Sequence, residues 1–167
     1  MRNVKRHYTF GQMCFVTHVT HERKPILTEH FDILWQSFEI HRQRQMYDII
    51  AWVVLPDHWH ALIDPMSNDM AALMRKIKLS FSSFYRKNSP QRSIKLWQHR
   101  YWDHIIRDQD DFNRHVDYIH YNPVKHGLVK RPLEYRYSSF CEYFERGVYG
   151  PDWGVSGDID VNGEFGE

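Results

Sequence analysis

Cysteine is scarce in this chain of 167 residues, and the two cysteines that it has, Cys14 and Cys141, lie far apart. They cannot form a disulfide framework or a thiolate metal site, which is typical of proteins from a reducing compartment. Long apolar runs are also lacking: no stretch approaches the length needed to span a bilayer, and the N-terminus lacks the apolar core of a signal peptide. The sequence therefore predicts a cytoplasmic protein without a membrane segment.

Acidic residues are missing between Met70 and Trp102, although the whole chain has 21 of them. The same stretch contains eight basic residues: Arg75, Lys76, Lys78, Arg86, Lys87, Arg92, Lys95 and Arg100. Serine and aromatic residues lie between them, and this mixture suits phosphate contacts and base stacking on single strands. The stretch is equally typical of an ordinary solvated helix face followed by a loop.

Basic residues are missing after Arg146, where the five charged residues are all acidic. Residues 1–146 therefore hold 22 basic and 16 acidic residues, a net charge of +6. A chain of this length, 42% hydrophobic and 16% aromatic, is expected to bury one core. We predict one domain over 1–146, followed by a weakly ordered acidic tail over 147–167.

Apolar patterns predict an alternation of strands and helices. The strands are expected over 12–20, 47–55 and 58–64 and within 97–107. The helices are expected over about 29–45, from Asn68 or Asp69 onward, and from about 108 to Asn122, before Pro123. The order predicts an α+β, ferredoxin-like (RRM-like) antiparallel sheet, β-α-β-β-α-β, with helices packed on one face and an added C-terminal helix.

Two histidines, His58 and His60, lie in the third expected strand. Because alternate residues of a strand share a face, the two imidazoles project together while Trp59 points the other way. Such a pair can hold a divalent cation, and since thiolates are missing, Mg²⁺ or Mn²⁺ is at least as reasonable as Zn²⁺. An isolated His-x-His pair is, however, more often structural than catalytic.

The last expected helix adds two candidates, Tyr118 and Asn122, which share a helix face because they are four residues apart. The apolar stripe of Phe112, Val116 and Ile119 is rotated away from that face. The helix can therefore bury this stripe and present Tyr118 elsewhere, so Tyr118 need not belong to the core. A tyrosine that merely borders a core with its hydroxyl in water is also common.

Together, four of these residues predict a specific chemistry. A cation on His58, His60 and the Asn122 oxygen would leave positions for a phosphate that Tyr118 faces. The phenolate would attack phosphorus, expel a 3′-hydroxyl and form a 5′-phosphotyrosine link. Because a phenol with a pKa of about 10 is mostly protonated at neutral pH, the attack needs the cation or a nearby base, which the sequence does not identify.

Three blocks of sequence then follow one another: Leu-Pro-Asp-His-Trp-His at 55–60, Trp-Gln-His-Arg-Tyr-Trp-Asp-His at 97–104, and Val-Asp-Tyr-Ile-His-Tyr-Asn-Pro-Val-Lys-His-Gly at 116–127. They resemble the REP-associated tyrosine transposases, which are single-tyrosine HUH transposases of the bacterial insertion-sequence type. The resemblance covers roughly residues 5–145, and three ordered blocks are far more specific than one motif.

This resemblance implies a nuclease domain that cuts and rejoins single-stranded DNA beside imperfect hairpins, with Mg²⁺ or Mn²⁺ and without a nucleotide cofactor. His58 and His60 fall on the HUH pair, and Tyr118 falls on the nucleophile. Asn122 falls on the third metal-ligand position, where many relatives have glutamine. Tyr121 is the rival nucleophile, but it faces elsewhere on the helix and has no matching partner four residues later.

The resemblance also implies partners: hairpin or single-stranded DNA of the REP type, bound by a monomer rather than a dimer near the nucleoid. The expected DNA contacts are Arg2, Lys5, Arg6, Arg75, Lys78, Arg86, Arg100 and Lys125. The first three resemble the basic leader of the family, although a basic terminus is more often plain solvated chain. Five histidines stay outside the expected metal site as surface or packing residues: His99, His104, His115, His120 and His126.

Three functions remain open at this level. The first is a transposase-like endonuclease and strand transferase for REP-type hairpins, which needs His58, His60, Tyr118 and Asn122 together. The second is a non-cleaving hairpin-binding protein that organises or regulates chromosomal repeats, for which the basic stretch alone would suffice. The third is a small metal-dependent hydrolase of another phosphoester.

Overall fold

The computed structural model describes residues 12–45, 47–66, 69–89, 95–155, 159, 163 and 165–167. Their elements are β1 (Cys14–Val19), η1 (His21–Arg23), α1 (Phe31–Gln45), β2 (Asp48–Val54), β3 (His58–Asp64), α2 (Met70–Asn88), β4 (Trp102–Ile105), α3 (Gln109–Lys125), η2 (Pro132–Glu134) and α4 (Phe140–Glu145). The described strands form one sheet in the order β2-β3-β1-β4, and each neighbouring pair is antiparallel. The predicted ferredoxin-like α+β fold is confirmed.

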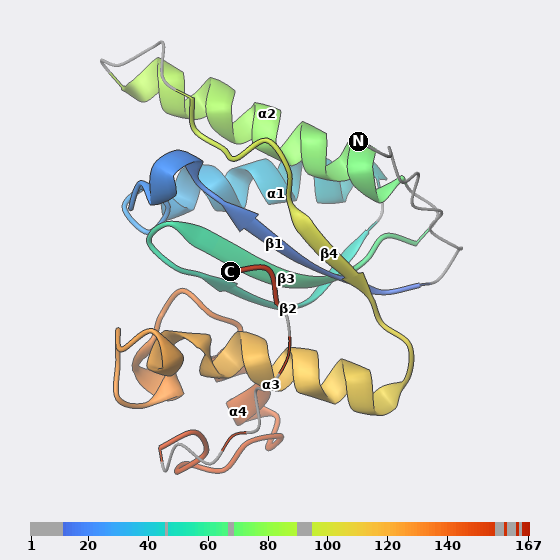
Figure 1. The fold of residues 1–167 in the computed structure, drawn as a ribbon, viewed down its shortest axis with the longest axis vertical. Coiled ribbons are helices and arrows are strands. Elements are labelled where there is room, and N and C mark those ends of the chain that lie inside the picture. Colours follow the sequence, from blue (N-terminus) through green and yellow to red (C-terminus); the bar gives the residue numbers. More distant parts are fainter. Residues whose placement is uncertain are drawn as a thin grey trace.

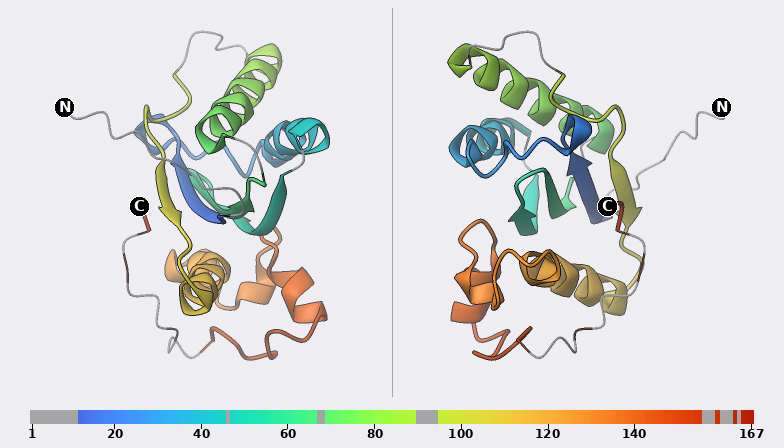
Figure 2. Two further views of the ribbon diagram at one scale, coloured as in Figure 1. Left: turned by 90° about the vertical axis from the view of Figure 1, so that its right-hand side faces the viewer. Right: turned by 60° about the vertical axis from the view of Figure 1, so that its left-hand side comes forward.

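Helices cover both faces of this sheet, as Figures 1 and 2 show. Helices α1 and α2 pack together on one face, whereas α3 and α4 lie on the other. Successive strand residues therefore enter different cores: Phe15 packs on the α3 side, and Val16 packs on the α1 and α2 side. The sheet therefore separates an apolar core under α1 and α2 from a second core under α3, and the predicted site lies in the second core.

The starts of two helices follow from their capping residues, as predicted. The Asp69 carboxylate accepts hydrogen bonds from the backbone amides of Ala71 and Ala72, at 2.9 and 3.2 Å, and so caps α2. Asp108 caps α3 in the same way, because its carboxylate accepts from the Asp111 amide at 2.8 Å. These caps set the positions from which the later residues of each helix are placed.

The prediction that α3 ends before Pro123 was wrong, because the helix continues through this proline to Lys125. Inside a helix, proline removes one hydrogen bond and its ring crowds the carbonyl four residues earlier, so other contacts must hold this last turn. The last carbonyls still find donors: Asn122 O accepts from the His126 amide at 3.0 Å, and Pro123 O accepts from the Leu128 amide at 2.9 Å. Lys125 thus lies two helical turns after Tyr118, on the same face.

Residues from the C-terminal part of the chain return to the domain. Tyr149 packs in the α3-side core with Phe140 and Trp153, and Phe165 is also buried there. The boundary after residue 146 stays a prediction.

Among the described residues, no helix combines the length and apolarity that a bilayer crossing requires. Arg2, Lys5 and Arg6 lie outside the described residues.

Candidate active site

The four residues predicted from the motifs come together between the sheet and α3. His58 and His60 are buried on the α3 side of β3, and their ring centroids are 5.0 Å apart. Tyr118 and Asn122 reach them from α3: the Tyr118 ring lies 5.3 Å from the His60 ring, and Asn122 Nδ2 lies 3.3 Å from His60 Nε2. His58 and His60 therefore share one strand face, and Tyr118 and Asn122 share one helix face, as the sequence predicted.

Tyr118 is nevertheless fully buried. Tyr118 and Asn122 are both 0% exposed, so Tyr118 belongs to the core, which the helix pattern did not require. The reason is that Phe165 stacks on Tyr118, with ring centroids 3.6 Å apart. Tyr121, by contrast, is half-buried and contacts Trp153.

Neighbouring oxygens fix the orientation of both imidazoles. His58 Nδ1 lies 2.6 Å from Asp57 Oδ1, so the hydrogen is on Nδ1. The Thr17 hydroxyl donates to Phe165 O at 2.6 Å and therefore accepts from His60 Nδ1 at 2.8 Å. Each ring keeps its Nε2 lone pair for another partner, which is the tautomer that a metal ligand needs.

The electrostatic environment supports this protonation state. Burial lowers the pKa of His60 to about 4, although the nearby Glu167 carboxylate opposes the shift. Burial raises the pKa of Asp57, but hydrogen bonds from His58 and Arg23 outweigh it and leave that pKa below its usual value. At neutral pH, His60 is therefore neutral and Asp57 is charged.

A carboxylate that the sequence did not predict, that of Glu167, lies at the centre of these residues. Its Oε1 accepts from the Tyr118 hydroxyl and from Asn122 Nδ2 at 2.7 Å, and it lies 3.3 Å from His126 Nε2. Its Oε2 accepts from Lys125 Nζ at 2.6 Å. Burial opposes ionisation, but the neighbouring His126 and Lys125 side chains hold the pKa of Glu167 well below its usual range. The site is built to hold an anionic group.

Lys125, which was predicted as a DNA contact, lies beside the phenol. Its Nζ donates to the Tyr118 oxygen at 3.2 Å and lies 4.8 Å from the centroid of the ring. Burial and the Glu167 carboxylate both raise the pKa of Tyr118, so this hydroxyl is protonated in the observed arrangement. A pocket of about 410 Å³ borders Tyr118, Lys125, Phe165 and Trp102.

The buried polar atoms fit a divalent cation. His58 Nε2 and Asn122 Oδ1 are buried without a hydrogen-bond partner among the described residues. His58, His60 and Glu167 each offer one ligand atom, and these atoms lie within 4.8 Å of one another. Imidazole nitrogens with carboxylate and amide oxygens, and no thiolate, make a donor set that suits Mn²⁺ or Mg²⁺ at least as well as Zn²⁺.

A second group of possible ligands, His104, Asp111 and His115, lies near the start of α3. Asp111 already accepts hydrogen bonds from His104 at 2.7 Å, from the Arg107 amide at 3.0 Å and from Arg114 at 3.3 Å. These contacts hold the pKa of Asp111 well below its usual value against the effect of its burial. We therefore interpret this group as one that stabilises the start of α3.

The remaining predicted DNA contacts are not part of this site. Arg75, Lys78 and Arg86 lie on α2, on the other side of the sheet, and Arg100 is exposed just before β4. Among the other histidines, His120 is buried, with Nδ1 3.0 Å from the Tyr149 hydroxyl and Nε2 2.8 Å from Ser139 Oγ. Three of the predicted DNA contacts thus lie on the opposite face of the sheet from the predicted catalytic residues.

Sequence reasoning missed several members of the site. Asp57 stands next to His58, so its position could have suggested it. Lys125 was expected to contact DNA, and its spacing of seven residues from Tyr118 could also have suggested that it lies beside the phenol. Thr17 carries no motif, and its role depends on the pairing of β1 with β3, which sets it opposite His60. Glu167 is 45 residues away from Asn122 in the sequence, and no pattern links the two.

Comparisons with known proteins identify the family of this chain. The family model described as an IS200-like transposase matches residues 10–122. A REP-associated tyrosine transposase of Escherichia coli strain K12 is 33% identical over 162 residues, which cover 95% of this chain and 93% of the relative. A Haemophilus influenzae protein assigned by name to the same group is also 33% identical, over 99% of this chain and 100% of that protein.

A solved structure of a REP-associated tyrosine transposase bound to a REP hairpin is also similar. It has a TM-score of 0.84 and 32% sequence identity, with 99% of this chain and 96% of the other covered. The chain therefore belongs to the IS200-like transposase family and, within it, to the REP-associated tyrosine transposases, which makes it a transposase-type DNA nicking and joining enzyme.

Proposed function

We propose that the protein is a metal-dependent endonuclease and strand transferase for single-stranded DNA, and that it acts through a 5′-phosphotyrosine intermediate. The observation that carries the proposal is the Glu167 carboxylate, which accepts from Tyr118, Asn122 and Lys125 beside the histidine pair. A DNA phosphodiester is an anion that needs the same kinds of donor. The carboxylate therefore marks the space in which Tyr118 would meet a scissile phosphate.

In the proposed reaction, the Tyr118 oxygen attacks phosphorus. A new O–P bond forms, the bond to the 3′ oxygen breaks, and the 3′ oxygen leaves with a proton. The 5′ end of the DNA stays on Tyr118 as phosphotyrosine. A later attack by a 3′-hydroxyl reverses these bond changes and joins the strands, so no nucleotide cofactor is needed.

The residues around the phenol have separate tasks in this proposal. Lys125 stabilises the phenolate, because a cation near the oxygen favours its charged form. Asp57 and Thr17 keep the two Nε2 lone pairs pointed at one place. When bound by His58, His60 and the Asn122 oxygen, Mg²⁺ or Mn²⁺ would polarise the phosphodiester and offset the charge added in the transition state.

The substrate that we propose is hairpin DNA of the REP type. The support is that the similar solved transposase was bound to a REP hairpin. The exposed basic residues on α2 and before β4 would contribute sequence-independent phosphate contacts. We expect a monomer that works in the cytoplasm beside the chromosome.

The test is to incubate the protein and a labelled REP-type hairpin with unpaired flanks in the presence of Mn²⁺ or Mg²⁺. With the label at the 3′ end of the strand, we expect a cut strand and a labelled, denaturant-resistant adduct, because the fragment downstream of the cut stays on the protein through its 5′ phosphate. Tyr118→Phe should abolish both, while it keeps the ring that stacks on Phe165. Tyr121→Phe is the matched control and should retain both.

Two results would contradict the proposal. An adduct that persists in Tyr118→Phe would place the nucleophile elsewhere. Tight hairpin binding without metal, with no cleavage or adduct in the wild-type protein, would make the protein a non-cleaving hairpin binder instead.

A further inference from the structure

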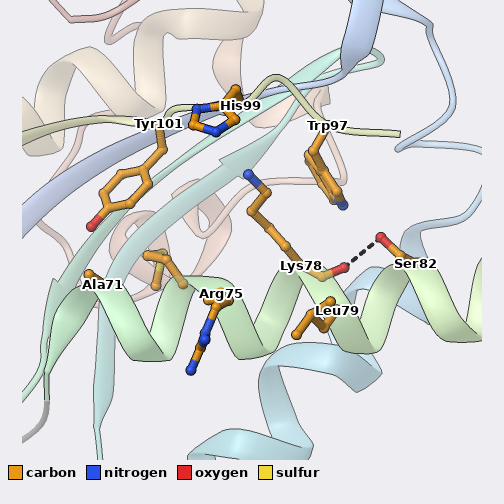
Figure 3. Close-up of a pocket in the computed structure, with 9 residues that line it drawn as sticks. Ala71, Arg75, Lys78, Leu79, Ser82, Trp97, His99 and Tyr101 are labelled. Atoms are coloured by element: carbon orange, nitrogen blue, oxygen red, sulfur yellow. Dashed lines mark hydrogen bonds between the residues drawn. The ribbon is translucent and has the colours of Figure 1, made fainter. Parts of the chain in front are cut away.

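A second pocket lies on the opposite side of the sheet from Tyr118, between α2 and residues 97–101. Its volume is about 340 Å³, within the range of pockets that bind small molecules. Figure 3 shows the rings of Trp97 and Tyr101 reaching toward α2 on two sides of Lys78. Leu79 also lines the pocket and is 61% exposed. The pocket therefore combines aromatic walls with a cation.

The charge of this pocket is of one sign. Lys78 and Arg75 line it, and none of its described lining residues is acidic. Lys78 is held in place because its Nζ donates to Gln98 O at 3.0 Å. A fixed ammonium beside aromatic rings suits an anionic group that is attached to a flat, apolar one.

Trp97 contributes an unused hydrogen-bond donor. Its side chain is 7% exposed, and its indole Nε1 has no hydrogen-bond partner among the described residues. Figure 3 shows this nitrogen at the end of the ring that points toward Ser82 of α2. Buried polar groups normally have partners, so a ligand with an acceptor would satisfy this donor.

The aromatic walls are rigid. Tyr101 stacks on His18 at 4.8 Å between ring centroids, and His18 stacks on Trp59 at 4.7 Å. Trp97 packs edge-on against Phe81 at 5.2 Å. These contacts fix the rings through the sheet and α2, so that a stacking ligand would not have to order them.

The position of the pocket connects it to the candidate active site. Tyr101 lines this pocket, whereas the next residue, Trp102, lines the pocket that borders Tyr118. Both lie at the start of β4, which is one of the two edge strands of the described sheet. A DNA strand that passes around this edge would therefore meet both pockets.

We propose that the α2-side pocket binds one unpaired nucleotide of the DNA substrate, with its base against Trp97 and Tyr101 and its phosphate near Lys78. This inference rests on the proposed function, since it assumes DNA as the substrate. Because the indole N–H lies in the plane of its ring, a base stacked on the Tyr101 ring would offer it an acceptor with its edge. The pocket would thus hold a nucleotide apart from the one that is cut.

The test measures binding with Tyr118→Phe protein in the absence of divalent cation, so that cleavage does not interfere. Each unpaired nucleotide of the hairpin substrate is replaced in turn by the fluorescent base 2-aminopurine or by an abasic site. We expect one position at which fluorescence is quenched on binding and at which the abasic site weakens binding by about tenfold, the effect of losing one stacked base.

Protein variants link that position to the pocket. In Tyr101→Leu the quenching should disappear, and the abasic site should then cause no further loss of affinity. Lys78→Gln should weaken binding more than Lys87→Gln, which removes the same charge from the same helix outside the pocket. Leu79→Glu places a carboxylate at the exposed rim and should weaken binding, whereas Val148→Glu, at a residue 54% exposed elsewhere, should not.

The outcomes separate the two proposals. If no position is quenched, or if the abasic effect is the same in Tyr101→Leu, the pocket assignment is overturned even when the wild-type protein cleaves hairpins. Equal losses in Lys78→Gln and Lys87→Gln would also overturn it, since they would indicate general attraction. Base-dependent binding at Tyr101 without any Tyr118-dependent cleavage would support the pocket and overturn the proposed cleavage.

Discussion

The two faces of the sheet each carry a buried histidine, and the two have opposite surroundings. His18, on the α1 and α2 side of β1, lies between the rings of Trp59 and Tyr101, and its Nε2 has no partner among the described residues. His60, on the α3 side of β3, contacts Thr17 through its Nδ1 and Asn122 and Glu167 through its Nε2. Burial of a histidine therefore does not by itself indicate a functional site. A site also needs several polar groups that point into one shared space.

The largest expected effect separates these two histidines. His60→Ala should lower the rate of hairpin cleavage at saturating DNA by at least about 100-fold, because even the outer partners of metal ligands cost about 10–100-fold. His18→Phe keeps a ring in the aromatic stack and should change this rate little. Initial rates with Mn²⁺ would measure both. If both variants fold and lose the same fraction of the cleavage rate, the two faces of the sheet do not differ in their role in cleavage.

The next effect concerns the groups behind the imidazoles. Thr17→Val has nearly the same shape but removes the acceptor for His60 Nδ1, so it should raise the Mn²⁺ concentration needed for half-maximal cleavage by roughly 10–100-fold. Thr20→Val, in the same segment but bonded to Asp57 O and Lys24 O, is a control that should leave the metal requirement close to that of the wild type. A normal metal requirement in Thr17→Val would remove Thr17 from the site.

Stability toward acid should not distinguish the faces. Burial lowers the pKa of His120, on the α3 side, to about 3, and it lowers the pKa of His18 well below 6.5. Both stay neutral when folded, while the unfolded chain takes up protons below pH 6.5. The free energy of unfolding should therefore fall as the pH drops below about 6.5, by roughly 1.4 kcal/mol per pH unit for each such histidine.

Urea unfolding at pH 7 and pH 5 would measure this loss. His120→Gln should make the pH dependence shallower by the contribution of one histidine, whatever its effect at pH 7. A pH dependence that is unchanged in this variant would show that His120 is charged in the folded protein.

The smallest expected effect concerns Glu167. Its carboxylate fills the space that the proposal gives to a phosphate, so Glu167→Gln should tighten the apparent affinity for hairpin DNA several-fold, because more of the protein is then competent to bind. Titration with a fluorescent hairpin, without metal, would measure this. Unchanged DNA affinity together with a higher Mn²⁺ requirement would instead make Glu167 a metal ligand.

Much of the fold could be predicted from local patterns. The strand pair of 47–55 and 58–64, the caps Asp69 and Asp108 and the order of the elements depend on neighbouring residues, and each agrees with the structure within a few residues. The passage of α3 through Pro123 could not be predicted in the same way. It depends on donors that reach its last carbonyls from the following turn.

The sequence by itself determined which residue types share a face: His58 with His60 through the two-residue period of a strand, and Tyr118 with Asn122 through the helical period. Only the tertiary structure decided that these faces meet, that Thr17 stands behind His60, and that Phe165 and Glu167 cover Tyr118. The physical reason is the range of each effect. Periodicity acts within one element, whereas burial, protonation and the convergence of donors depend on contacts between segments far apart in the chain.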